Sequence, residues 1–191
     1  MRREEVRDRA DRLVTRLEQW YERQDRGVLA RLRRGLSRTT QQEAWTVLGP
    51  WFGPTAVDCP VYETLAGCFA LHPISPVPDI GNFGETMRQV MGEEKMGKKD
   101  EPHARFRRLL ACSDSGEICQ HVRHAIRLAK SAKPQAVSVN YRQLFVDLWW
   151  WNDWTKIAWA KAYWNVPADA TEFALAGVGT PVEEQPAPMP E

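Results

Sequence analysis

Residues 103–133 read HARFRRLLACSDSGEICQHVRHAIRLAKSAK, two runs with helical spacing that a short polar turn separates. In the second run the apolar residues recur along one helical stripe, which a folded protein can bury; they are Ile118, Val122, Ala125, Ile126 and Ala129. Asp114, with Glu117 three residues later, suits a helix N-terminus, because carboxylates accept free backbone N–H groups there. The stretch therefore predicts a helix that begins near Ser115 and buries one face.

The opposite face of this helix is basic. Arg123, Arg127 and Lys130 follow the same spacing on the far side of the stripe, so we expect them to project together from an exposed face. The first run adds further positive charge through Arg105, Arg107 and Arg108. In all, residues 103–133 hold seven Lys or Arg against two acids. Such a face is either a solvated helix surface or an anion-binding surface, and composition alone favours neither.

The order of several short segments points to a family. HARFRRLL, a polar turn and HVRHAIRLAK occur in residues 103–130. Three more segments are LARLRRGL (29–36), GNFGETM (81–87) and NYRQLFVDLWWWND (140–153). In content and order these segments resemble the CasB family, the small subunit of the type I-E CRISPR Cascade surveillance complex. The resemblance covers roughly residues 28–164.

The resemblance implies a non-catalytic structural subunit without a cofactor. Two copies would line the inner face of Cascade, bridge its large and terminal subunits beside the backbone subunits, and help to hold the guide RNA. The displaced single-stranded DNA would lie along the basic face, because base pairing reads the sequence while protein cations neutralise phosphates. An alternative is a helical adaptor whose positive face binds acidic protein surfaces.

The candidate nucleic-acid-binding residues are all basic, and they are Arg33, Arg34, Arg107, Arg108, Arg123, Arg127, Lys130 and Arg142. The resemblance places Arg33 and Arg34 on the nucleic-acid surface, whereas a purely structural interpretation makes them solubilising charges. Arg142 lies near the exposed start of a helix that Asn140 can cap.

Composition supports an all-α fold of two small packed helical lobes. The chain has 191 residues, of which 43% are hydrophobic, and strand-like alternation does not recur. All 26 Lys and Arg but only 20 of the 25 acids lie in residues 1–164, so this body carries a formal charge of +6. We expect 1–164 to form the helical CasB-like domain and 165–191 to be a flexible, Pro-rich acidic tail.

Several local signals predict individual elements. We expect Gly27 to interrupt the first long helix, and Thr40 with Glu43 to form a capping box. His72 precedes a proline and is expected to be a capping or surface group. Pro73–Gly81 should cross in an extended form, and residues 92–101 should form a mobile loop.

Six tryptophans near the C-terminus allow either core packing or base stacking, and helical spacing favours packing. They are Trp149, Trp150, Trp151, Trp154, Trp159 and Trp164. We expect Trp154, Ile157, Ala158 and Lys161 to lie on the face that docks against the preceding helix. Of residues 149–151, one side chain should point away from the core.

Catalytic and metal-binding patterns are scarce. The sequence has no GxxxxGK[ST], HExxH or GxSxG motif, so we expect no enzyme and no catalytic residue. Cys112, Cys119, His121 and His124 lie close in sequence, but Cys119 and His121 diverge by nearly half a turn on one helix. We therefore expect buried thiols and surface histidines rather than a metal site. The absence of a long apolar segment indicates a cytoplasmic protein with no membrane contact.

Overall fold

The computed structural model describes residues 2–52, 59–73, 81–92, 103–132 and 137–166. All regular secondary structure in these ranges is helical, which confirms the predicted all-α class. The elements are α1 (Arg3–Glu22), α2 (Arg26–Arg34), α3 (Gln41–Leu48), the short 3-10 helix η1 (Gly49–Trp51), α4 (Cys59–Leu71), α5 (Phe83–Met91), α7 (Ala104–Ala111), α8 (Ser115–Ser131), α9 (Tyr141–Trp149) and α10 (Asp153–Trp164). Within the described ranges, no helix is long and apolar enough to cross a membrane.

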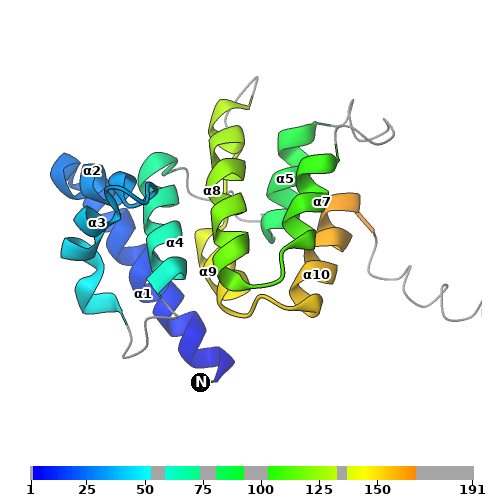
Figure 1. Cartoon of the computed structure of the whole chain (residues 1–191), viewed down its shortest axis with the longest axis horizontal. Helices are drawn as coiled ribbons and strands as arrows, with labels where there is room; N and C mark the ends of the chain where they lie inside the picture. The colour runs from blue at the N-terminus through cyan, green and yellow to red at the C-terminus, as the bar shows by residue number, and fades with distance from the viewer. Residues whose placement is uncertain (1, 53–58, 74–80, 93–102, 133–136, 167–191) are drawn as a thin grey trace, which may run out of the picture.

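The helices fall into two groups joined by a central pair (Figure 1). Helices α1 to α4 lie at one end, α5, α7 and α10 lie at the other, and α8 and α9 lie between them. Helix α8 packs on α4 on one side and on α5 and α7 on the other, while α9 packs on α1 and α4. A single core cluster runs through both groups, so the two predicted lobes share one hydrophobic interior.

Helix α8 is central because both its cap and its apolar stripe form as predicted. Asp114 accepts a hydrogen bond from the backbone N–H of Glu117 (2.9 Å), which satisfies a free donor of the first turn. The stripe predicted from the sequence is buried along its whole length, with Ile118, Val122 and Ile126 fully covered. This burial fixes which face of α8 points outward.

Helices α5 and α10 cross at very close range. A Cβ atom placed on Gly84 would lie 2.0 Å from the backbone oxygen of Trp159, so only glycine permits this approach. The Asn82 side chain donates to the carbonyl of Ala158 (3.0 Å), and the Trp159 indole donates to Asp147 (2.6 Å). Together these contacts fix α10 against α5 and α9.

Two helix boundaries differ from the sequence prediction. The first long helix is interrupted at Gln24, whose φ is 52°, and not at Gly27, which lies inside α2. The carboxylate of Asp25 caps α2 by accepting from the N–H of Val28 (3.0 Å). The expected capping box at Thr40 does not form, because its hydroxyl donates instead to the carbonyl of Arg34 (2.8 Å).

Helix α10 turns a different face inward from the one expected. Thr155, Trp159 and Tyr163 are buried, whereas Trp154 is 80% exposed and Ile157 is 48% exposed. The expected docking face of α10 was therefore wrong, because the inward stripe begins one residue later than the tryptophan pattern suggests.

The three consecutive tryptophans all contact the core, so the expectation that one points away was also wrong. Trp151 is buried and donates to the carbonyl of Cys112 (3.0 Å), while Trp149 packs edge-on against Tyr62. The chain leaves the helix at Trp150, whose φ and ψ are −104° and 44°, and this turn redirects the side chains inward.

His72 is buried, which corrects the predicted surface or capping role. Its Nε2–H donates to the carbonyl of Val137 (2.6 Å), and the Tyr141 hydroxyl donates to the carbonyl of His72 (2.7 Å). The end of α4 is thereby bound to the segment that leads into α9.

Three expectations concern residues outside the described ranges. These are most of the extended crossing at 73–81, most of the loop at 92–101, and all but the first two residues of the acidic tail at 165–191. The proposed domain boundary after residue 164 stays a prediction.

Candidate nucleic-acid interface

Helix α7 presents its arginines outward because its other face is packed. Phe106 stacks on Tyr163 of α10, with ring centroids 3.7 Å apart and planes 12° apart, and Leu109 is also buried. These two anchors lie three residues apart, on one face of the helix. Arg105, Arg107 and Arg108 are therefore left exposed.

A groove of about 560 Å³ lies between α7 and α8. Its polar lining comes from both helices, with Arg105 and Arg108 from α7 and His121, His124 and Arg127 from α8. Its apolar lining is Met87, Leu109, Ala125 and Leu128. Among the described residues that line it, none is a carboxylate. We call this feature the α7–α8 groove.

The α7–α8 groove is suited to an anion. Three guanidinium groups line it, and one of them, Arg127, donates through Nη1 to Nδ1 of His124 (3.3 Å). A guanidinium presents several N–H donors in a fixed plane, a geometry that matches phosphate oxygens. With no acid in the lining, no described carboxylate there competes for these donors.

A second hollow of about 380 Å³ lies on the other side of α8, toward the turn between α2 and α3, α3 itself and α4. Arg38 and Arg123 line it, and Glu63 lines it as well, so its charge is partly balanced. Arg127 and His124 belong to both linings, so they lie between the α7–α8 groove and this second hollow.

Arg123 does not project from the exposed face as predicted. Its Nε donates to the hydroxyl of Thr64 (2.9 Å), and its Nη2 lies 3.7 Å from a carboxylate oxygen of Glu63. The Arg123 side chain is only 13% exposed and that of Glu63 only 8%. The side chain crosses the α4–α8 contact, because an arginine beside the apolar stripe is long enough to reach the neighbouring helix.

Two other predicted residues are already paired with acids. Arg142 contacts both carboxylate oxygens of Glu18 (2.8 and 3.0 Å) and lies 3.3 Å from Asp11. This pairing raises the pKa of Arg142 and joins α9 to α1. Arg34 forms an ion pair with Glu43 of α3. Either arginine would have to exchange its carboxylate for a phosphate in order to bind nucleic acid.

The other five predicted residues differ in whether they line the α7–α8 groove. Arg108 and Arg127 are brought together in the α7–α8 groove, although nineteen positions separate them in the sequence. Arg33, Arg107 and Lys130 are exposed but lie outside its lining. Arg33 donates through Nε to the carbonyl of Leu29 (3.2 Å), so it folds back on its own helix.

Three groove residues were not among the predicted site residues: Arg105, His121 and His124. The spacing of Arg105 and Arg108 by three residues places them on one helix face and could have identified the first of these. No signal in the sequence identified the histidines, because their role depends on α7 lying beside them.

The structure also gathers a potential metal-ligand set. It differs from the grouping considered in the sequence, since Cys119 is buried on the inward face of α8. Atoms of Cys112, Glu117 and His121 that could each bind a metal lie within 4.8 Å of one another.

Comparison with known families settles which family the chain belongs to. The family described as CRISPR-associated protein Cse2 matches residues 28–164. The chain is a member of the Cse2 family. Cse2 is the family also called CasB, so the resemblance deduced from the short segments is confirmed.

The fold has a counterpart among solved structures. A chain of the solved structure named "CRISPR RNA-guided surveillance complex" superposes with a TM-score of 0.65, covering 88% of this Cse2-family chain and 99% of that chain at 18% identity. At this identity the likeness concerns the fold. Among curated proteins, none matches the sequence significantly.

Proposed function

We propose that this Cse2-family chain is a non-catalytic subunit of an RNA-guided CRISPR surveillance complex that binds nucleic acid through the α7–α8 groove. The observation that carries the proposal is a groove with three arginines from two helices and no carboxylate among its described lining residues. Family membership, and the surveillance complex from which the superposed chain comes, support the assignment to such a complex.

The chemistry of the groove favours phosphate over base recognition. Phosphate contacts hold a strand in place without reading its sequence, and they make binding strongly dependent on salt. In the described lining the only rings are the imidazoles of His121 and His124, so an aromatic platform for stacked bases is lacking there. Such a groove suits a complex in which base pairing between guide and target supplies the specificity.

The proposed ligands are the guide RNA and the displaced strand of target DNA. A positively charged groove that follows the backbone is the usual means of holding a single strand without sequence preference. Keeping the displaced strand in this groove would oppose its return to the target strand and so favour the guide–target duplex.

Helix α10 supports the proposed contacts with other protein subunits. Trp154, Ile157 and Trp164 are 80%, 48% and 48% exposed and lie along one side of the helix. Exposed apolar side chains grouped in this way are typical of protein–protein interfaces. Large, backbone and terminal subunits of Cascade, and a second copy of the chain, are the proposed partners.

The alternative function is an adaptor that binds acidic protein surfaces. The same arginines would serve that role, so the two functions are separated by the ligand and not by the site. The two roles are separated by binding to single-stranded DNA. If the logarithm of the affinity falls linearly with the logarithm of salt concentration, and does so similarly for unrelated base sequences, the nucleic-acid role is favoured.

Copurification tests the assignment to a complex. A tagged chain should recover the other Cascade subunits and a guide RNA of uniform length from cells that express the whole system. We expect recovery of the protein subunits to survive nuclease treatment, because the exposed apolar side chains of α10 are proposed to contact other subunits directly. Recovery of the chain alone, in a folded state, would contradict membership of the complex.

A further inference from the structure

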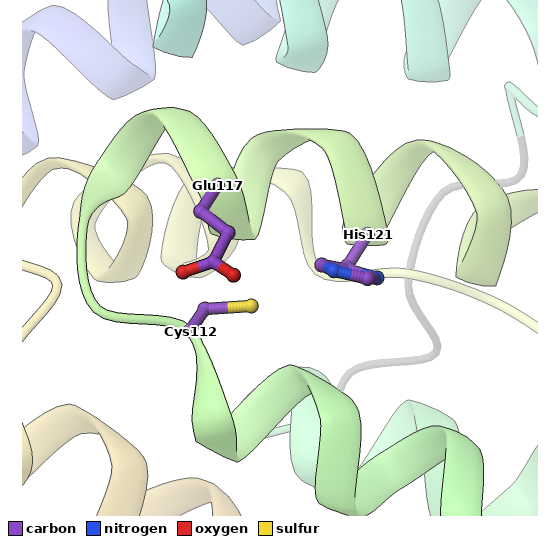
Figure 2. Close-up of side chains that lie close together, drawn as sticks. All are labelled: Cys112, Glu117 and His121. Atoms are coloured by element: carbon purple, nitrogen blue, oxygen red, sulfur yellow. The ribbon is translucent and has the colours of Figure 1, made fainter.

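Cys112, Glu117 and His121 form a cluster that the nucleic-acid role does not use (Figure 2). Glu117 and His121 are four residues apart on α8 and point from one side of it toward the turn that carries Cys112. The sulfur of Cys112 lies on the same side as the carboxylate and the imidazole ring. Three different donor types therefore converge from two elements.

The geometry points to a binding site for a divalent transition metal, with Zn²⁺ as the best-matched ion, formed by Cys112 Sγ, a carboxylate oxygen of Glu117 and a ring nitrogen of His121. Thiolate and imidazole donors favour such ions over Mg²⁺ or Ca²⁺, which take oxygen ligands. Three protein ligands leave a fourth position for water or an anion.

The ligand atoms are close to the required spacing. Bonds of 2.0–2.3 Å around tetrahedral Zn²⁺ imply separations of about 3.3–3.8 Å between ligand atoms. The three atoms already lie within 4.8 Å of one another. The remaining contraction of roughly 1 Å is within reach of side-chain rotation, because Glu117 is exposed and His121 is half-buried.

A neighbouring group already orients one of the ligands. The backbone N–H of Ser113 donates to Glu117 Oε2 (2.7 Å). The indole of Trp151 donates to the backbone carbonyl of Cys112 (3.0 Å), which holds the main chain that carries the thiol. A hydrogen bond to a ligand group, such as the one to Glu117, holds that ligand in position and contributes to metal affinity. The thiol of Cys112 now contacts the carbonyl of Arg108 (3.2 Å), a weak bond that metal binding would replace.

Binding must release a proton from the thiol. Burial first, and then the nearby charges of Glu117 and Asp114, raise the pKa of Cys112 to about 11, while Lys156 of α10 acts in the opposite direction. The balanced step is loss of H⁺ from sulfur as the sulfur–metal bond forms. Zinc affinity should therefore rise with pH.

The site would act on the α7–α8 groove through its position. Cys112 directly follows α7, and Glu117 and His121 belong to the first turns of α8, so the metal would cross-link the turn between them. His121 also lines the groove. A bound cation would thus hold α7 and α8 together and add positive charge at one end of the α7–α8 groove.

The test is zinc binding to the full-length protein in competition with a chromophoric chelator, with Co²⁺ as a spectroscopic probe. We expect one zinc per chain, thiolate-to-cobalt charge-transfer absorption, and a melting temperature that rises with zinc. Cys112→Ser and His121→Gln should each weaken zinc binding at least about 100-fold, since loss of an outer hydrogen-bond partner alone costs 10–100-fold.

Matched controls separate this site from adventitious binding. Cys59→Ser removes a half-buried thiol elsewhere, and His124→Gln removes an exposed imidazole three residues from His121 on the same helix. Both variants should bind zinc as the wild-type chain does and retain the cobalt absorption. The proposal is overturned if the wild-type chain binds no stoichiometric zinc, or if Cys112→Ser and His121→Gln bind as tightly as these controls.

Discussion

At the scale of single residues, the arginines of α8 differ in what they already contact. Arg123 is nearly covered and lies between Thr64 and Glu63, whereas Arg127 is exposed in the α7–α8 groove. One arginine therefore maintains the packing of α8 on α4, and the other is available to a ligand. Their spacing of four residues gave no sign of this difference.

Replacing Arg123 should destabilise the fold far more than replacing Arg127. Arg123→Ala leaves the carboxylate of Glu63 buried beside the indole N–H of Trp45 without a cation, so we expect the free energy of unfolding to fall by about 2–3 kcal/mol. Arg127→Ala should change it by less than about 0.5 kcal/mol. Urea unfolding measures both values. Equal stability of the two variants would show that the Arg123–Glu63 contact contributes little.

His72 should make stability depend on pH. Burial lowers its pKa from the ordinary value of 6.5, and Lys130 lowers it further against the opposing hydrogen bond to Val137. Below pH 6.5 the unfolded chain therefore binds more protons than the folded chain, and stability is lost as the pH falls through this window. Above it, the contribution is fully present.

The His72→Gln variant isolates this contribution, because glutamine keeps an N–H donor but does not titrate. Urea unfolding between about pH 7.5 and pH 5 should show a smaller loss of stability in the variant than in the wild-type chain. Parallel pH profiles for the two proteins would mean that His72 is protonated in the folded state as easily as in the unfolded state.

At the scale of elements, the close approach of α10 to α5 explains why residue 84 is glycine, which helical periodicity cannot explain. Gly84 belongs to the segment GNFGETM, yet the reason for glycine lies in α10, about seventy-five residues later, where the carbonyl of Trp159 approaches. Gly84→Ala should lower the free energy of unfolding by about 3 kcal/mol or more, because backbone must move.

Gly49→Ala provides the matched control, since a Cβ at Gly49 meets nothing within 4 Å. We expect this variant to change stability by less than about 1 kcal/mol. Thermal unfolding compares the two. If Gly84→Ala melts at the wild-type temperature, α5 and α10 do not pack as closely as described.

Some elements follow from local sequence signals and others do not, for physical reasons. The stripe and cap of α8 were correct because an amphipathic period and an N-cap are local signals. For α10 the exposed face is itself rich in apolar residues, so periodicity identified the wrong side as buried. The buried state of His72 depends on the carbonyl of Val137, which no local pattern reveals.

At the scale of the whole molecule, the candidate site exists only because two helices face each other. Arg108 and Arg127 were predicted separately, and packing of Phe106 on Tyr163 turns α7 so that its arginines meet those of α8. Pairing with Glu18 or Glu43 is equally invisible in the sequence, because these acids come from distant helices. The number of arginines could be counted from the sequence. Which of them are paired with a carboxylate and which line the groove could not be predicted from it.

The central claim is that the α7–α8 groove binds nucleic-acid phosphates, and the salt dependence of single-stranded DNA binding tests it most directly. The variant Arg108→Ala with Arg127→Ala is compared with a control that removes the same charge from α1, Arg7→Ala with Arg12→Ala, after both are shown to fold. If each groove arginine neutralises one phosphate, the slope of log affinity against log salt becomes shallower by about 1.4 in the groove variant. The loss of affinity should be similar for unrelated base sequences, and the control should retain the wild-type slope. An unchanged affinity and slope in the folded groove variant, or an equal loss in the control, would contradict the claim.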